Sequence, residues 1–152
     1  MAVYLVQHGK SRPKEVDPDQ GLSGEGIAET ERMARLAIDL GLRVDRIMHS
    51  GKKRARETAE MYAAALKPEQ SAAEAAGLNP LDDVAPWQSL DSGGRLMLVG
   101  HLPFMERLAA LLVAGNPEKT VIRFRNSGIV CLEREEGPGG WTIRWALVPR
   151  VG

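Results

Sequence analysis

Two apolar segments that stop at a histidine limit the folds open to this chain more than any other feature. Residues 2–7 run directly into His8, and residues 95–99 run into a glycine followed by His101. Short apolar runs rich in β-branched residues and bounded by glycine are typical of buried strands. In α/β proteins, ligands bind at the carboxyl ends of such strands. We therefore expect both histidines to face one crevice.

Helical patterns alternate with these strands. Residues 22–40 place apolar side chains at helical spacing behind Ser23, a candidate N-cap. Residues 43–50 then predict a second strand, and residues 51–66 predict a second helix that ends before Pro68. This order of strand, helix and strand indicates a βαβ unit, from which parallel sheets are built.

The second half of the chain predicts two further helices and several strands, the last two of which form a hairpin. A short helix near residues 81–90 precedes the strand at 95–99, and an apolar helix runs from Pro103 to about residue 114. The remaining predicted strands are 120–124, 128–133 and 141–149, the last two joined by a turn rich in glycine and proline. We predict one α/β domain over residues 1–152. It has three layers, a mostly parallel central sheet with helices on both faces, and a C-terminal antiparallel hairpin.

Charge and composition disfavour several classes of partner. The chain has 20 basic and 20 acidic side chains, so it lacks the positive charge that nucleic-acid binding requires. The longest apolar run, residues 108–115, is too short to span a bilayer. Cys131 is the only cysteine and cannot form an internal disulfide, which favours a reducing compartment. We expect a cytoplasmic protein with no nucleic-acid or membrane partner, and its oligomeric state stays open.

Positive charge gathers at the start of the second predicted helix. Its first two turns carry Lys52, Lys53, Arg54 and Arg56, where the helix dipole disfavours cations. A phosphate held by free backbone N–H groups and a guanidinium would explain this placement. For three of these side chains an ordinary solvated surface is the alternative, whereas Arg54 is the candidate phosphate ligand.

Several short motifs together resemble the histidine phosphatase superfamily, which has the phosphoglycerate mutase-like fold. They are "HG" after the first strand, "LSGEG" at the first helix, "RARETA" after the second strand and "GHLP" after a later one. The resemblance continues in "NSG" at residues 126–128 and "WALVP" at 145–149, so it covers essentially the whole chain. Within the superfamily it points to the small SixA-type phosphohistidine phosphatases.

The resemblance implies a role for each matched residue. His8 would attack phosphorus and become a phosphohistidine that water hydrolyses. His101 would donate hydrogen bonds to the phosphoryl oxygens, and Arg54 would clamp them. A neutral imidazole is a competent nucleophile near its ordinary pKa, so neither a metal nor another cofactor is expected. Further candidate phosphate contacts are Gln7, Gly9, Ser50 and Ser127.

Gln7 departs from the family pattern, which is Arg-His-Gly. A glutamine amide can donate a hydrogen bond, but it carries no charge and forms no charged bidentate pair. We expect a rate penalty of about 100- to 1,000-fold unless a nearby cation compensates. The candidates for that compensation are Lys10, Arg12 and Lys14. Two functions stay open: a phosphatase, or an impaired pseudophosphatase that binds phosphorylated ligands or partners.

No residue stands out as the general acid for ester cleavage. Glu74 is the first candidate, Asp17 and Asp19 are others, and each is alternatively a surface carboxylate. An imidazole leaves phosphorus with less need of a proton than an alkoxide does. The expected substrate is therefore phosphohistidine in a protein or a small phosphorylated compound.

Overall fold

A mixed sheet forms the centre of the computed structural model, which describes residues 1–91, 93–137 and 139–151. Within these residues the sheet has six strands in the order β3-β2-β4-β1-β5-β6. The strands are β1 Ala2–Gln7, β2 Arg46–His49, β3 Ala73–Glu74, β4 Arg95–Gly100, β5 Ile129–Arg134 and β6 Trp141–Leu147. The first four in spatial order are parallel, and β5 runs antiparallel to both β1 and β6.

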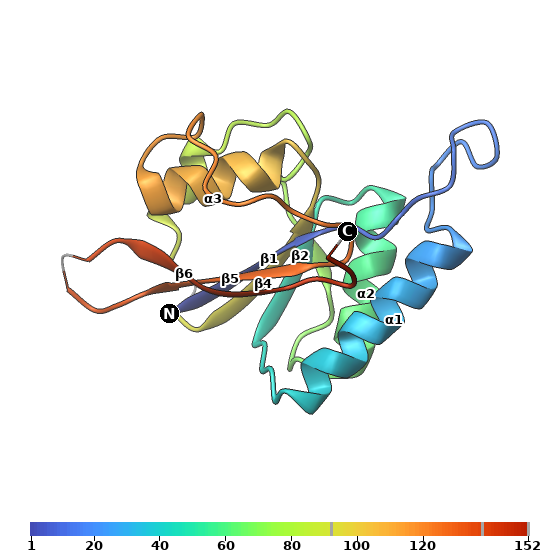
Figure 1. Cartoon of the computed structure of the whole chain (residues 1–152), viewed down its shortest axis with the longest axis horizontal. Coiled ribbons are helices and arrows are strands. Elements are labelled where there is room, and N and C mark those ends of the chain that lie inside the picture. The colour runs from blue at the N-terminus through green and yellow to red at the C-terminus, as the bar shows by residue number, and fades with distance from the viewer. Residues whose placement is uncertain (92, 138, 152) are drawn as a thin grey trace.

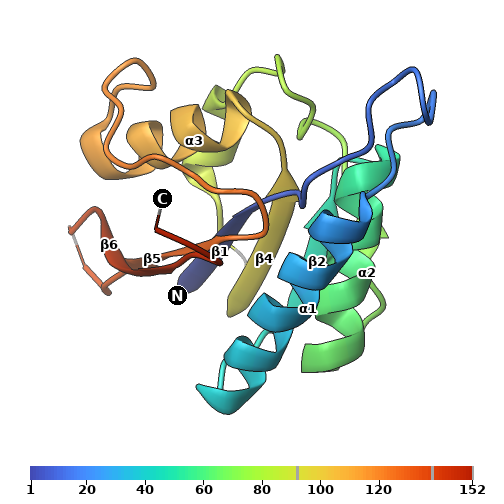
Figure 2. The ribbon, with the colours of Figure 1, turned by 45° about the vertical axis from the view of Figure 1, so that its right-hand side comes forward.

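Helices cover both faces of the sheet (Figures 1 and 2). Helices α1 (Gly24–Asp39) and α2 (Lys53–Leu66) pack on one face, and α3 (Phe104–Ala114) packs on the other with a short 3₁₀ helix, Ala85–Ser89. Alternation along β1 explains the two cores, because Val3 and Leu5 join the α3 side whereas Tyr4 and Val6 join the α1–α2 side. The predicted three-layer α/β fold and its C-terminal hairpin are confirmed.

The structure corrects the prediction at three segments. Residues 120–124 do not form a strand. Instead, Val121 and Ile122 pack beside the α3 core, and the Phe124 N–H donates to the Glu106 carboxylate at 2.9 Å. The helix expected near 81–90 is the shorter 3₁₀ turn at Ala85–Ser89. Strand β3 escaped prediction because two exposed residues carry no readable alternation.

The register of the parallel strands sets where the functional side chains lie. Gln7 is opposite Gly100, and His49 is opposite Val99, so β1, β4 and β2 end at the same edge of the sheet. The loops that leave this edge carry the residues singled out above. Among the described residues, no helix combines the length and the apolar character needed to cross a membrane.

Candidate active site

His8 and His101 face each other at the carboxyl edge of the sheet. Their ring centroids are 5.0 Å apart, and the His8 backbone N–H donates to the Gly100 carbonyl at 2.9 Å. This contact continues the β1–β4 ladder by one residue, which explains why the two imidazoles meet. The convergence expected from the sequence is therefore present.

The His8 ring is held in one tautomer. Its Nδ1 lies 2.7 Å from the Gly9 carbonyl oxygen, which can only accept, so Nδ1 carries the proton and Nε2 keeps its lone pair. Burial lowers the pKa of His8, the Gly9 contact opposes that shift, and the charge of Arg54 adds to it. His8 is thus a neutral imidazole at physiological pH, with a free nucleophilic nitrogen.

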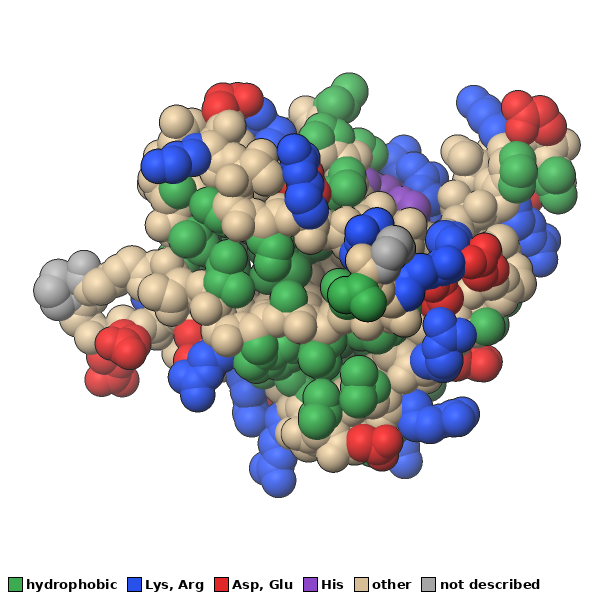
Figure 3. Space-filling model, viewed as in Figure 1, with side chains coloured by type: hydrophobic (Ala, Val, Ile, Leu, Met, Phe, Trp, Pro, Cys, Tyr) green, Lys and Arg blue, Asp and Glu red, His purple; other side chains and the backbone are tan. Residues whose placement is uncertain are grey.

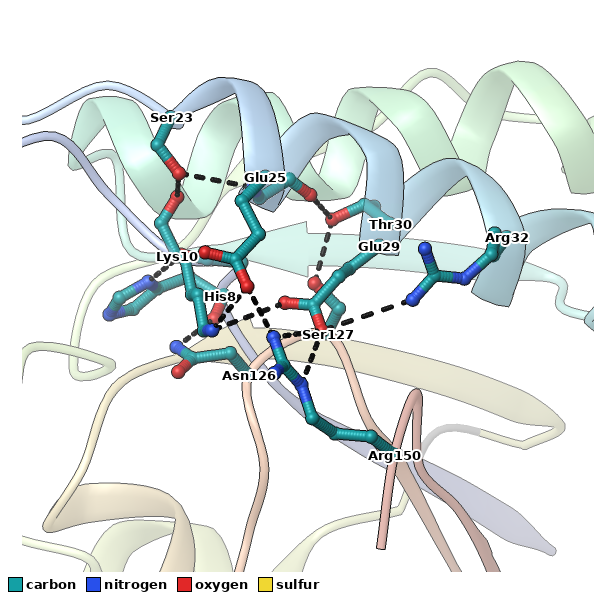
Figure 4. A network of polar contacts seen from close by, with 12 residues as sticks. His8, Lys10, Ser23, Glu25, Glu29, Thr30, Arg32, Asn126, Ser127 and Arg150 are labelled. Carbon is teal, nitrogen blue, oxygen red and sulfur yellow. Dashed lines mark hydrogen bonds and ion pairs between the residues drawn. The ribbon is translucent and has the colours of Figure 1, made fainter. Parts of the chain in front are cut away.

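The backbone around Gly9 is fixed from several sides, and Figure 4 shows Asn126 beside His8. Its N–H donates to Thr58 Oγ1 at 2.9 Å, and the His8 carbonyl accepts from Asn126 Nδ2 at 2.8 Å. A Cβ on Gly9 would lie 2.9 Å from Thr30 Oγ1 and 3.0 Å from Ser127 Oγ. Glycine is therefore required by packing toward the interior, a reason that differs from the expected approach of phosphate.

Ser127 supports this loop from behind. Its side chain is fully buried, and its hydroxyl is hydrogen bonded to Thr30 Oγ1 at 2.7 Å. Its N–H donates to the Gln7 carbonyl at 2.9 Å, and its own carbonyl accepts from the Tyr62 hydroxyl at 2.5 Å. In this conformation the hydroxyl faces the interior and Ser127 braces the end of β1, so its contact with phosphate stays a prediction.

His101 is almost fully buried and is oriented by Ser50. The Ser50 hydroxyl lies 2.6 Å from His101 Nε2 and also accepts from the Lys52 N–H at 3.3 Å. Among the described residues His101 Nδ1 has no hydrogen-bond partner. Burial lowers the pKa of His101 to about 3, with further contributions from the charges of His8, Arg54 and Lys52. His101 is therefore neutral at physiological pH.

Arg54 supplies the positive charge of the site. It lies in the first turn of α2, which contains no acidic residue and whose N-cap, Lys52, makes no side-chain capping bond. Burial lowers the pKa of Arg54, which stays protonated at any physiological pH. No hydrogen bond or ion pair of its guanidinium is found in the described part of the chain. The free N–H groups of α2 and this guanidinium suit an anion.

The three candidate general acids differ in their surroundings. Glu74 is exposed at the end of β3, opposite His49, and its carboxylate lies where a Cβ on Gly51 would collide with it. Asp17 accepts from the Gly21 N–H, the Lys53 ammonium and the Asp19 N–H, which together lower its pKa. Asp17 is thus held ionised, the wrong form for a proton donor. Asp19 lines a hollow together with Arg54, and Glu74 lies beside Gly51, so both stay candidates by position.

A charged network that the sequence did not reveal lies beside the His8 loop (Figure 4). Lys10 Nζ is 2.7 Å from Glu25 and 3.9 Å from Glu29, whose side chain is only 3% exposed. Arg150, near the end of the chain, binds both carboxylates, with its Nε 3.0 Å from Glu29 Oε2. Lys10 therefore points to α1 in this structure and does not replace the charge missing at Gln7. No ion pair of Arg12 or Lys14 occurs among the described residues.

All three histidines of the chain should titrate below the ordinary value of about 6.5. Burial is the main cause in each case. His101 should take up its proton at the lowest pH of the three, with a pKa of about 3. Since unfolded His101 takes up its proton near pH 6.5, its contribution to the free energy of unfolding is complete above that pH and is lost as the pH falls toward 3. Histidine Hε1 NMR signals followed against pH test this, and a His101 signal with a midpoint at or above 6.5 contradicts it.

Comparison with known proteins places this fold and site in a family. The sequence profile of the histidine phosphatase superfamily (branch 1) matches residues 3–80, and the chain belongs to this superfamily. It is 28% identical to the phosphohistidine phosphatase SixA of Escherichia coli over 156 aligned positions, covering 98% of this chain and 94% of that protein.

Solved structures agree with this assignment. The structure of the protein histidine phosphatase SixA complexed with tungstate superposes with a TM-score of 0.83 at 26% identity, covering 98% of this chain and 97% of the other. An Agrobacterium tumefaciens protein described as a phosphohistidine phosphatase SixA gives a TM-score of 0.75 at 28% identity, with 97% of each chain covered. The fold and the family are therefore those of a histidine phosphatase.

Proposed function

We propose that this protein is a metal-independent phosphatase that transfers a phosphoryl group to His8 and then to water. One observation carries the proposal. His8 Nδ1 is hydrogen bonded to the Gly9 carbonyl, which leaves Nε2 unprotonated. The centroid of the His8 ring lies 5.0 Å from that of His101, and the charge of Arg54 acts on His8. Such a nitrogen attacks phosphorus without first losing a proton.

The reaction has two displacements. In the first, the Nε2 lone pair of His8 forms a bond to phosphorus, and the bond to the leaving group breaks with its electron pair. In the second, water attacks phosphorus, the N–P electron pair returns to Nε2, and phosphate leaves with the proton balance completed by solvent. The Gly9 carbonyl stabilises the positive charge on the His8 ring between the two steps. In this proposal Arg54 and the free N–H groups at the start of α2 bind the phosphoryl oxygens, and His101, whose ring lies 5.0 Å from that of His8, assists them.

A phosphoramidate suits this site better than a phosphate ester. Ester cleavage needs a proton on the leaving oxygen, and the two remaining candidates, Glu74 on a two-residue edge strand and Asp19, are exposed carboxylates. A phosphorylated histidine leaves as an imidazole and needs less help. The SixA relatives act on phosphohistidine by their names, and one of them binds tungstate, a tetrahedral oxyanion like phosphate. We therefore propose phosphohistidine in a protein or a small phosphorylated compound as the substrate.

Gln7 favours a second candidate function. It occupies the position at which the family pattern has an arginine, and Lys10, the nearest cation in sequence, is bound to Glu25 at 2.7 Å. A site with one arginine can bind phosphate while turning it over slowly. A pseudophosphatase that binds phosphorylated ligands or partners is thus the alternative to the enzyme.

Trapping the intermediate tests the proposal. The protein is mixed with a phosphohistidine peptide, quenched in alkali, where phosphohistidine is stable, digested and analysed by mass spectrometry. We expect a phosphoryl group on the peptide that contains His8, appearing before free phosphate accumulates. Label on another residue, or phosphate release without any label, contradicts the mechanism. Binding of phosphate with neither label nor release identifies the pseudophosphatase.

A further inference from the structure

A hollow of about 500 Å³ lies between the loop that follows β1 and the first turns of α2. The described residues that line it include five cations, namely Lys14, Lys52, Lys53, Arg54 and Arg56, against one carboxylate, Asp19. In the space-filling view a histidine side chain is visible beside Lys and Arg side chains, between the protruding loop and the body of the molecule (Figure 3). The chain as a whole is neutral, so this concentration of positive charge is local.

The charges in the hollow are only partly neutralised. Lys53 is bound to Asp17 at 3.1 Å, and Arg56 lies 3.8 Å from Glu60. Lys14 and Lys52, by contrast, have no carboxylate partner within the described ranges. Arg54 faces the reacting phosphate in the proposed mechanism, which leaves two cations unaccounted for.

The hollow opens beside the phosphate site. The Lys52 N–H donates to Ser50 Oγ, which lies 2.6 Å from His101 Nε2. Lys52 and Arg54 line the same hollow, and the charge of Lys52 makes the smallest of the named contributions to the lowered pKa of His101. A molecule whose phosphoryl group sits between the histidines and Arg54 would have this hollow beside it, because Arg54 also lines the hollow.

The loop that carries Lys14 is fixed to α2. Its two ends pair through an isolated bridge between Ser11 and Leu22, and the Leu22 N–H donates to the Glu57 carboxylate at 2.9 Å. The ion pair of Asp17 and Lys53 joins the loop to the first turn of the helix. A braced loop thus holds Lys14 at the hollow that Lys52 also lines.

We propose that Lys14 and Lys52 form a subsite for a second anionic group of the substrate, a carboxylate or a phosphate, next to the phosphoryl group that His8 accepts. This inference rests on the proposed function of the site and narrows its substrate class. Substrates with one isolated phosphoryl group are then poorer than those with a neighbouring negative charge. An exposed pair of this kind selects modestly and is sensitive to salt.

Two phosphohistidine peptides that differ only in flanking glutamate or glutamine residues test the subsite. The measured quantity is the ratio of their kcat/KM values, in the native protein and in the Lys14→Ala/Lys52→Ala double variant. Lys119→Ala is the matched control, because this exposed lysine follows α3, whose end lies on the side of the molecule away from the loop (Figure 1). A general loss of activity affects both peptides equally and leaves the ratio unchanged.

We expect the native protein and Lys119→Ala to prefer the glutamate peptide by roughly fivefold through KM, and the double variant to lose this preference. The preference should also vanish at about 1 M salt, where the screening length is roughly 3 Å. A double variant that keeps the ratio overturns the proposal. So does one that loses turnover of both peptides equally, since the lysines then act on the reacting phosphate itself.

Binding measurements show whether the second anionic group is a phosphate or a carboxylate. They also test the subsite separately from the proposed catalytic function. Calorimetry compares methylphosphonate with bisphosphonates of increasing linker length in the same proteins. Tighter binding at one linker length that disappears in the double variant identifies a second phosphate, whereas an effect confined to the glutamate peptide identifies a carboxylate. If the native protein turns over neither peptide, the proposed function fails. The subsite is then supported if a bisphosphonate binds more tightly than methylphosphonate and the double variant loses this difference. It is overturned if either result is absent.

Discussion

Turnover should fall by roughly 10⁴-fold or more when His8 is replaced by alanine, because among the described residues of the site no other side chain offers an accessible, unprotonated ring nitrogen. His101 Nε2 is engaged with Ser50 at 2.6 Å, and His101 Nδ1, which has no partner among the described residues, is buried away from the surface. His101 therefore cannot take over as the nucleophile. The measurement is release of phosphate from phosphohistidine peptides and from p-nitrophenyl phosphate, in native protein and in His8→Ala.

Folding of the variant is the control for this experiment. The His8 backbone is held by bonds that its side chain does not make, from its N–H to the Gly100 carbonyl and from Asn126 to its own carbonyl. We therefore expect His8→Ala to keep its circular dichroism spectrum and to go on binding inorganic phosphate. Residual turnover above about a tenth of the native value would mean that the reaction does not pass through His8.

Replacing Gln7 with arginine should raise kcat/KM by about 100- to 1,000-fold. Gln7 ends β1 next to the nucleophile and opposite Gly100, and in the described structure its amide makes no hydrogen bond. A guanidinium there would add a charged fork of donors to the one that we propose Arg54 supplies to the phosphoryl oxygens. The assay is hydrolysis of the same peptides and of p-nitrophenyl phosphate.

Gln7→Lys is the matched control for charge without the planar fork. We expect it to recover part of the gain, since an ammonium is a point charge with no bidentate geometry. Equal rates for native protein and Gln7→Arg would show that the neutral amide does not limit the reaction. A silent native protein that becomes active as Gln7→Arg would instead identify a binding protein that lost its enzymatic function with one side chain.

The elements that carry the site were predictable because their signals are local. The strand runs ending at His8 and His101, and the cations at the start of α2, are readable within ten residues of sequence. The apolar segment 120–124 misled the prediction because it reads like a strand, although its side chains pack beside α3 and its backbone has no strand partner. The pattern of apolar residues indicates that a segment is buried, but it does not show whether its backbone pairs with a strand.

The supports of the site were not predictable, because they join distant parts of the chain. Arg150 meets Glu29 across 121 positions, and Thr30 meets Ser127 across 97. A glutamate that is only 3% exposed within a helix looks in sequence like any solvated charge. Ser127 likewise lies in a motif that suggests phosphate contact, and only its full burial shows that the hydroxyl faces inward.

The position of Arg150 has a practical consequence for anyone who purifies this protein. An affinity tag before Met1 leaves from the start of β1, at the end of the strand opposite His8 (Figure 1). Removing Arg150 would instead leave Glu25 with Lys10 alone among its described ion-pair partners, and the buried Glu29 with Lys10 at 3.9 Å and Arg32 at 4.0 Å. Lys10 lies two positions after His8, so the shortened protein would have an altered loop beside the residue whose reaction is being measured. Activities are best compared on protein that is tagged at the amino end and intact at the other.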